Sequence, residues 1–295
     1  MRAWLRFAIV VLLPLTVRAH TGVALEPHDF WTSWTFDPGV ILPLLLTSFL
    51  YARGARRSRG VSISQAVCFW SGWFVLFVSL VSPLHSLGEA LFSAHMAQHE
   101  LLMLGAAPLL VLSRPLVPLL WGLPVSWRRG IGKRAKAGLI QRLWHGMSRP
   151  FAAWWIHAAA LWVWHAPGLF QATLSSEPVH AAQHVSFLAS ALLFWWSLFY
   201  ARGRAGYGLG VLYIFTTAVH TSILGALLTF APRVWYPAYS GRGAAWGLTA
   251  LEDQQIGGLI MWVPAGVVYV AAGLALFAAW LQTSELRSAQ RTYAG

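Results

Sequence analysis

Residues 255–281 read QIGGLIMWVPAGVVYVAAGLALFAAWL and include no charged side chain. A helix needs only about 20 apolar residues to cross the hydrocarbon core of a bilayer, so this segment predicts a transmembrane helix. Six further segments of the same character precede it. The sequence therefore predicts an all-α membrane protein, a bundle of seven transmembrane helices within residues 36–281. The six earlier segments lie at about 36–53, 62–83, 90–112, 150–169, 180–201 and 208–231.

The composition supports this fold class. Hydrophobic residues make up 57% of the 295-residue chain and charged residues only 10%. Soluble domains carry about 25% charged residues, so a water-soluble globular protein is excluded. The net charge of +12 falls in short loops between apolar segments, so we expect the lipid bilayer as partner and no nucleic acid. The single cysteine, Cys68, excludes an intrachain disulfide and any cysteine-based metal motif.

The distribution of basic residues predicts the orientation of the bundle. Arginine and lysine gather after the first, third, fifth and seventh segments, whereas the opposite side has only Arg233 and Arg242. Cytoplasmic loops carry the excess of basic residues. We therefore expect a multi-pass protein of the bacterial plasma membrane, with its amino terminus outside and its tail, residues 282–295, in the cytoplasm.

Residues 1–19 resemble a secretory signal peptide. A basic start precedes a short apolar core, and Val17-Arg18-Ala19 is similar to a small-residue cleavage site. Cleavage there would leave His20 as the first residue of an exported segment, residues 20–35. The alternative is an uncleaved anchor. As a new amino terminus, His20 could bind a metal ion through its α-amine and its imidazole together.

Two similar motifs stand at the start of long apolar segments: His95-Met96-Ala97-Gln98-His99 and His180-Ala181-Ala182-Gln183-His184. Residues four apart lie on one face of a helix, so each motif directs two imidazoles to the same side. Imidazoles within a bilayer are costly, and they mark functional sites by default. The four histidines are therefore predicted metal ligands. Three glutamines are predicted to orient histidine rings by hydrogen bonds: Gln98, Gln183 and Gln254.

Further candidate ligands lie in other segments. His165 is expected near the outer face, and His157 and His220 near mid-depth, where each could equally form a hydrogen bond between helices. Imidazole and thioether groups suit Cu(I), whereas imidazole with carboxylate suits zinc or iron. The additional candidates for a metal site are Met103, Met261 and Asp253.

Four strings of residues resemble a known family. They are FSAHMAQH at 92–99, APLLVL at 107–112, LWVWHAP at 161–167 and DQQIGGLIMW at 253–262. Together they are similar to the multi-pass CtaG-type cytochrome c oxidase assembly family, over about residues 35–285. The resemblance implies a seven-span plasma-membrane protein that is needed to build haem–copper oxidases and is suspected of supplying copper. By matching positions it implies roles for His95, His99, His165, His184 and Asp253.

The expected function is that of a non-enzymatic assembly factor. It would accept copper from a periplasmic donor and hold Cu(I) transiently through His95 and His99, with His184 or His165. It would then pass the copper to the nascent catalytic subunit of a haem–copper oxidase.

Three alternatives remain open at this stage. A seven-span zinc hydrolase would use three histidines and Asp253 to activate water. A haem-binding protein would use His99 with His184. A copper permease would use His157 and His220 as intermediate sites.

Overall fold

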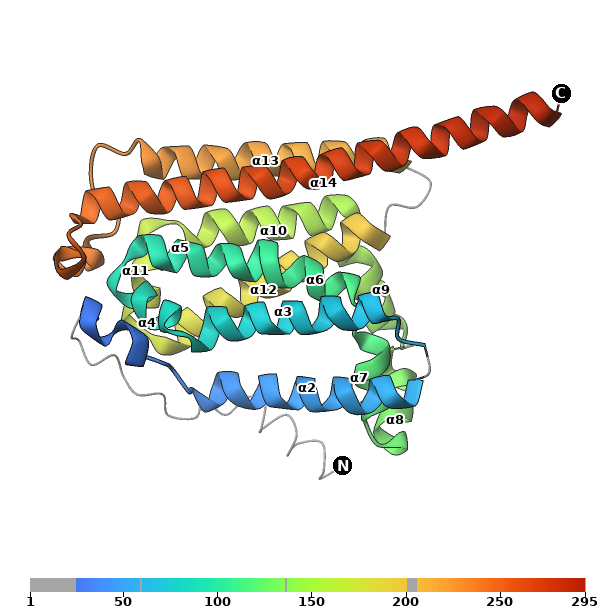
Figure 1. Cartoon of the computed structure of the whole chain (residues 1–295), viewed down its shortest axis with the longest axis horizontal. Coiled ribbons are helices and arrows are strands. Elements are labelled where there is room, and N and C mark those ends of the chain that lie inside the picture. The colour runs from blue at the N-terminus through green and yellow to red at the C-terminus, as the bar shows by residue number, and fades with distance from the viewer. Residues whose placement is uncertain (1–24, 59, 136, 201–205, 295) are drawn as a thin grey trace.

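The computed structural model describes residues 25–58, 60–135, 137–200 and 206–294, and every regular element in these ranges is a helix (Figure 1). This confirms the predicted all-α fold. The predicted signal peptide and His20 lie outside the described residues.

Five of the described helices are long and apolar enough to cross a membrane, so the chain is a multi-pass membrane protein. They correspond to the first, second, fifth, sixth and seventh predicted segments. They are α2 (Pro38–Ser58), α3 (Ile63–Val81), α12 (Glu177–Tyr200), α13 (Gly206–Thr229) and α14 (Ala250–Ala294), the last of which is apolar over Ala250–Gln282.

The third predicted segment is a broken helix. It begins as α5 (Phe92–Glu100), continues as the π-helix η2 (Leu101–Ala106) and ends as α6 (Ala107–Leu112). The chain then bends by 71° into α7 (Leu116–Gly122), and the two parts make a sixth candidate span if they are counted together. The bend follows Arg114, whose φ of 50° lies in the left-handed region.

The fourth predicted segment, 150–169, forms two short helices. α10 (Pro150–Trp164) has 15 residues, fewer than the about 20 that cross the hydrocarbon core, and α11 (Pro167–Ser175) follows it. Proline fits the first turn of a helix, where no backbone N–H is needed, so Pro167 begins a new helix. By length and composition the described residues therefore supply five or six spans, and the fourth predicted segment does not form a helix long enough to count among them.

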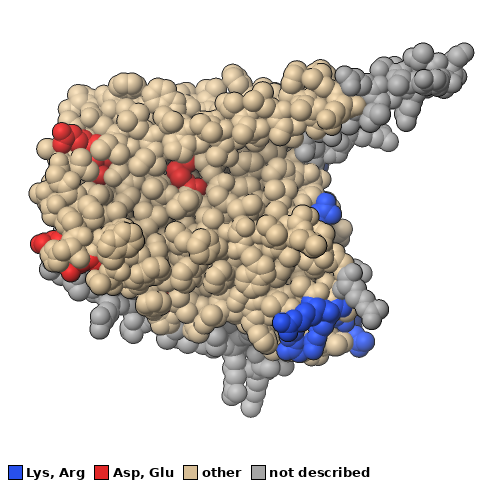
Figure 2. Space-filling model, viewed as in Figure 1, with Lys and Arg blue, Asp and Glu red and all other residues tan. Residues whose placement is uncertain are grey.

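The two ends of the bundle differ in charge. Figure 2 shows lysine and arginine side chains at one end and most of the acidic side chains at the other. The acidic end carries η1 (Pro27–Thr32), α4 (Pro83–Ala90), η4 (Pro237–Tyr239) and η5 (Ala244–Trp246). The basic end carries α7, α8 (Val125–Ala135) and α9 (Gly138–Met147).

Glycines allow two pairs of helices to approach closely. A Cβ atom added to Gly258 on α14 would lie 2.7 Å from the carbonyl oxygen of Gly225 on α13. On α2, a Cβ atom added to Gly54 would overlap the backbone of Pro118 on α7. Small residues serve this purpose in membrane bundles. The first contact fixes the α13–α14 pair, and the second fastens the bent segment α7 to α2.

The main hydrophobic core lies between α12, α13 and α14 and extends to the π-helix. Phe194, Trp195, Tyr213 and Tyr269 are buried in it, together with Met103 of η2. The Trp195 indole Nε1–H donates a hydrogen bond of 2.9 Å to the Met103 carbonyl oxygen. This bond satisfies the Met103 carbonyl group within the π-helix, where the regular α-helical hydrogen-bond pattern is interrupted.

The loop between α13 and α14 closes the acidic end of the bundle. Its Tyr236 hydroxyl donates to the carbonyl oxygen of His165 at 2.8 Å, and its Tyr239 hydroxyl donates to the carbonyl oxygen of Gly88 at 2.9 Å. Burial raises the pKa of Tyr239 well above its ordinary value, so the hydroxyl group keeps the proton that it donates. The loop is thus tied to the end of α10 and to α4.

Candidate metal centre

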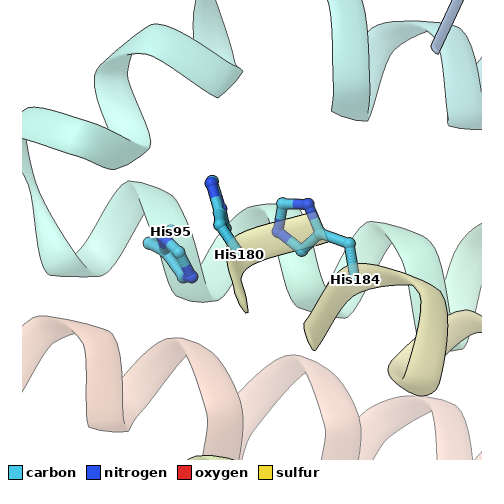
Figure 3. A group of neighbouring side chains, drawn as sticks. All are labelled: His95, His180 and His184. Carbon is cyan, nitrogen blue, oxygen red and sulfur yellow. The ribbon is translucent and has the colours of Figure 1, made fainter. Parts of the chain in front are cut away.

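The two histidine motifs face each other across α5 and α12. Within each motif the two rings lie 4.4 Å apart between centroids, as the i, i+4 spacing predicts. Between the motifs, the ring centroids of His95 and His180 are 5.3 Å apart, and those of His99 and His184 are also 5.3 Å apart. Figure 3 shows His95, His180 and His184 grouped between the two helices.

Three of these histidines come close to the geometry of a shared ion. One ring nitrogen from each of His95, His180 and His184 lies within 4.8 Å of the other two. Nitrogens that bind one metal ion at about 2.0–2.1 Å lie no more than about 4 Å apart. Small side-chain rotations would therefore bring the three nitrogens onto a common centre.

His165 approaches the same group from the end of α10. Its ring lies 6.3 Å from that of His99, and only 2% of the residue is exposed. Its Nδ1 is 2.7 Å from the carbonyl oxygen of Leu161. A carbonyl oxygen can only accept, so Nδ1 carries the proton and Nε2 of the neutral ring offers its lone pair. The helix that carries His165 thus holds the ring in a tautomer whose Nε2 could bind a metal ion.

His85 on α4 also belongs to this cluster, although the sequence did not single it out as a site residue. Its ring stacks on His180 at 5.5 Å and lies 6.2 Å from His184. The sequence offered only a general signal: ten of its eleven histidines are expected within the membrane or on its outer side, and His85 is one of them. We refer to His85, His95, His99, His165, His180 and His184 as the histidine cluster.

The glutamines of the two motifs contact histidines of the cluster. Gln98 Nε2 donates to Nδ1 of His85 at 2.9 Å and to the carbonyl oxygen of Ser79 at 2.7 Å. Gln183 Oε1 lies 3.3 Å from Nε2 of His95. Partners of this kind fix the tautomer and direction of a ligating imidazole.

Several ring nitrogens in the cluster are buried and have no hydrogen-bond partner. They are Nδ1 and Nε2 of His99, Nε2 of His165 and Nε2 of His184. A buried polar group without a partner costs about 1–3 kcal/mol. A metal ion would satisfy these nitrogens, and a donor set made of neutral imidazoles suits copper or zinc. The residues present therefore fit a metal ion.

Aromatic rings wall the cluster on one side. Phe170 of α11 lies 5.2 Å from His95, and Phe187 of α12 lies 4.6 Å from His99, between ring centroids. Both phenylalanines are fully buried. Such walls exclude water, which strengthens the interaction between imidazoles and a cation.

Asp253 lies at the N-terminus of α5. Its carboxylate accepts hydrogen bonds from the backbone N–H of Phe92 at 2.6 Å and of Ser93 at 3.0 Å, and from the Ser93 hydroxyl group at 2.5 Å. The structure thus gives Asp253 the position of a helix cap supplied by another helix.

The two predicted thioether ligands, Met261 and Met103, and the third predicted glutamine, Gln254, contact other parts of the bundle. Met261 packs with Met96 and Phe92 in a hydrophobic cluster, and Met103 packs in the main core. Gln254 Oε1 accepts from the backbone N–H of Trp235 at 2.6 Å and so fastens the loop before α14. The structure thus gives each of these three side chains packing or hydrogen-bond partners outside the histidine cluster.

His157 and His220 form a separate polar site between α10, α12 and α13. His157 Nδ1 lies 3.1 Å from the Ser190 hydroxyl oxygen. The ring of His220 meets the edge of Trp154 at 5.1 Å, and both of its nitrogens are buried without a hydrogen-bond partner. The hydrogen bond of His157 matches the structural alternative considered for it from the sequence.

Comparison with known proteins gives one family. Residues 49–283 match the family described as "Cytochrome c oxidase caa3 assembly factor". The chain is also 26% identical to uncharacterized proteins of Mycobacterium bovis and Mycobacterium tuberculosis over 84% of its length, and 24% identical to one of Mycobacterium leprae over 90%. It spans only 39–43% of the length of these relatives. No solved structure matches the chain.

Proposed function

The chain belongs to the cytochrome c oxidase caa3 assembly factor family, and on this premise we propose that it supplies copper to the oxidase. It accepts copper from a periplasmic donor, holds Cu(I) transiently in the histidine cluster and passes it to the nascent catalytic subunit. It performs this role in the bacterial plasma membrane and without enzymatic chemistry of its own.

The observation that carries the proposal is the histidine cluster itself. Six imidazoles from α4, α5, α10 and α12 surround one small region, and several of their nitrogens are buried without a partner. A cargo ion needs a site that can exchange one ligand for another. The cluster has more imidazoles than a single Cu(I) ion requires, and the ring centroid of each lies 4.4–6.3 Å from that of at least one other. Such an arrangement provides this exchange.

The proposed arrangement in the membrane has seven spans, of which α10 is the shortest. The basic end of the bundle lies in the cytoplasm, because basic residues accumulate on that side of a membrane. The acidic end, with α4 and the loop that closes it, then faces the outside (Figure 2). This places the histidine cluster in the outer half of the bilayer, toward the periplasmic donor and beside a membrane-embedded acceptor.

Specific residues of the chain prepare the cluster for its cargo. Gln98 orients His85, and the Leu161 carbonyl group orients His165. Phe170 and Phe187 exclude water from one side. Asp253 holds the beginning of α5, and with it the first histidine motif, against α14.

Elemental analysis of the purified protein tests the proposal. The protein in detergent is incubated with Cu(I) under reducing conditions, and the bound metals are counted after desalting. We expect near-stoichiometric copper in the wild type and little in the variant with both His95→Ala and His99→Ala. His145→Ala is the matched control, because His145 is an exposed histidine on α9 at the other end of the bundle. Retention of zinc or haem iron in place of copper would contradict the proposal.

A second measurement connects the site to the oxidase. Cells that carry the double variant should insert the protein normally but assemble an oxidase that lacks copper. Oxidase with full copper content in those cells would contradict a role in supply.

A further inference from the structure

Helix α9 at the basic end of the bundle has an apolar face that the described part of the chain leaves mostly exposed. All ten residues of α9 are exposed. The apolar ones recur at a spacing that places them on one side of the helix, and Leu139, for example, is 68% exposed. They are Leu139, Ile140, Leu143, Trp144 and Met147. The polar Gln141, Arg142 and His145 occupy the opposite side.

A ring contact fixes the depth of this helix. Trp144 lies 5.7 Å from Trp196 between ring centroids, at an interplanar angle of 65°. Trp196 belongs to the last two turns of the span α12, next to Tyr200 at its end. Tryptophan and tyrosine at the end of a span lie at the level of the lipid headgroups. The apolar face of α9 is therefore level with the membrane interface.

The segment formed by α7, α8 and α9 is anchored where α7 packs closely against α2. α7 turns away from the direction of the preceding helix by 71° and is fastened to α2. Gly54 meets Pro118 there, and Gly122 meets Leu50, with no room for a side chain in either place. Figure 1 shows α7, α8 and α9 placed across the end of the bundle. This close contact gives the segment α7–α9 a defined orientation relative to the spans.

The region of α8 and α9 is strongly basic. No aspartate or glutamate occurs in the sequence between Glu100 and Glu177. In the same stretch, α8 carries four basic residues and α9 carries Arg142. The four residues on α8 are Arg128, Arg129, Lys133 and Arg134. A basic segment beside an amphipathic helix is the arrangement that binds anionic lipid surfaces.

We propose that α8 and α9 form a lipid-binding arm on the cytoplasmic side of the membrane. The apolar face of α9 inserts among the acyl chains, and the basic side chains of α8, with Arg142, bind the phosphate groups of anionic phospholipids. This site lies at the opposite end of the bundle from the histidine cluster and does not depend on copper.

The first experiment measures where α9 lies. The full chain, with Cys68→Ser as background, is spin-labelled at Leu143→Cys or at Gln141→Cys and placed in nanodiscs that contain phosphatidylglycerol. We expect the label at 143 to be accessible to dissolved oxygen and the label at 141 to a water-soluble nickel chelate. Access of the nickel chelate to the label at 143 would overturn the proposal. Shielding of that label from both reagents would also overturn it, in favour of a protein partner.

The second experiment measures lipid selectivity. Native mass spectrometry of the full chain counts the phosphatidylglycerol and phosphatidylcholine molecules that it retains. The variant with Arg128→Gln and Arg129→Gln should bind phosphatidylglycerol about tenfold more weakly or worse. The matched control is Arg56→Gln with Arg57→Gln, which removes the same charge from the exposed end of α2, and it should retain most of the affinity. Equal retention of the two lipids by the wild type would overturn the proposal.

Discussion

The carboxylate of Asp253 accepts two hydrogen bonds from Ser93, a residue 160 positions earlier in the chain: 3.0 Å from its backbone N–H and 2.5 Å from its hydroxyl group. The N-terminal N–H groups of a helix have no partner within the helix and carry partial positive charge. α14 therefore supplies the cap that α5 lacks locally. Since His95 and His99 follow within two turns, this contact sets their position relative to α14.

The exchange Asp253→Asn should reduce stability and leave copper binding nearly unchanged. Asparagine keeps the shape of the side chain but loses its charge and one acceptor oxygen, so we expect a loss of about 1–2 kcal/mol. Thermal unfolding in detergent, followed by elemental analysis, measures both quantities. Glu252→Gln is the control, because Glu252 is exposed and bonds only within its own turn. Loss of copper at unchanged stability would instead identify Asp253 as a ligand.

The exchange Gln98→Leu should weaken Cu(I) binding about 10–100-fold, the usual effect of removing a partner that orients a ligating histidine. Leucine is similar in volume but cannot donate to His85 or to the Ser79 carbonyl group. Competition with a Cu(I) chelator measures the affinity. Gln141→Leu on the exposed α9 should bind copper as the wild type does. An unchanged affinity for Gln98→Leu would mean that His85 takes no part in the site.

The exchange Gly258→Val should destabilise the α13–α14 pair by about 1–3 kcal/mol, since overpacking forces the backbones apart. A Cβ atom at Gly258 would meet Thr229 Oγ1 at 2.5 Å. Gly266→Val on the same helix is a matched control, because a Cβ atom there has no neighbour within 4 Å. The difference in unfolding temperature between the two variants measures the effect. Equal temperatures would show that the two helices can separate without loss.

The exchange Trp195→Phe should cost about 1–3 kcal/mol, because it leaves the carbonyl group of Met103 buried without its donor. Trp155→Phe, at a largely exposed tryptophan of α10, should change the unfolding temperature little. If the two variants unfold together, the indole of Trp195 contributes packing only.

The main features of the fold and the pairing of the motifs could be predicted because they follow from local patterns. Long apolar runs form helices in a membrane, and i, i+4 histidines share a face whatever surrounds them. The family resemblance was likewise confirmed over residues 49–283. The fourth segment is not one long helix: α10 ends at Trp164 and Pro167 begins α11. The apolar composition of the segment predicted a continuous helix, although this proline was a visible sign of a break.

The positions of His85 and Asp253 could not be predicted from the sequence, because they depend on contacts between helices that are distant in the chain. His85 lies in a short helix after Pro83, and only the packing of α4 against α5 and α12 brings it to the cluster. Asp253 was predicted as a ligand because carboxylate together with imidazole suits zinc or iron, and only the structure shows that its carboxylate caps α5. A hint of its position was nevertheless present, since Leu91 precedes α5 and cannot cap it with its side chain.

The shortness of α10 has a consequence for the bilayer itself. Its 15 residues cover about 22 Å at the rise of an α-helix, whereas the hydrocarbon core is about 30 Å thick. In the seven-span arrangement this hydrophobic mismatch thins the membrane beside α10 or draws the outer headgroups inward. Because α10 ends next to His165, which the proposed orientation places on the outer side, the thinning would shorten the path of a cation from the external water to the imidazoles. The oxidase subunit would therefore meet this protein across a locally deformed leaflet, and membrane thickness would affect their exchange.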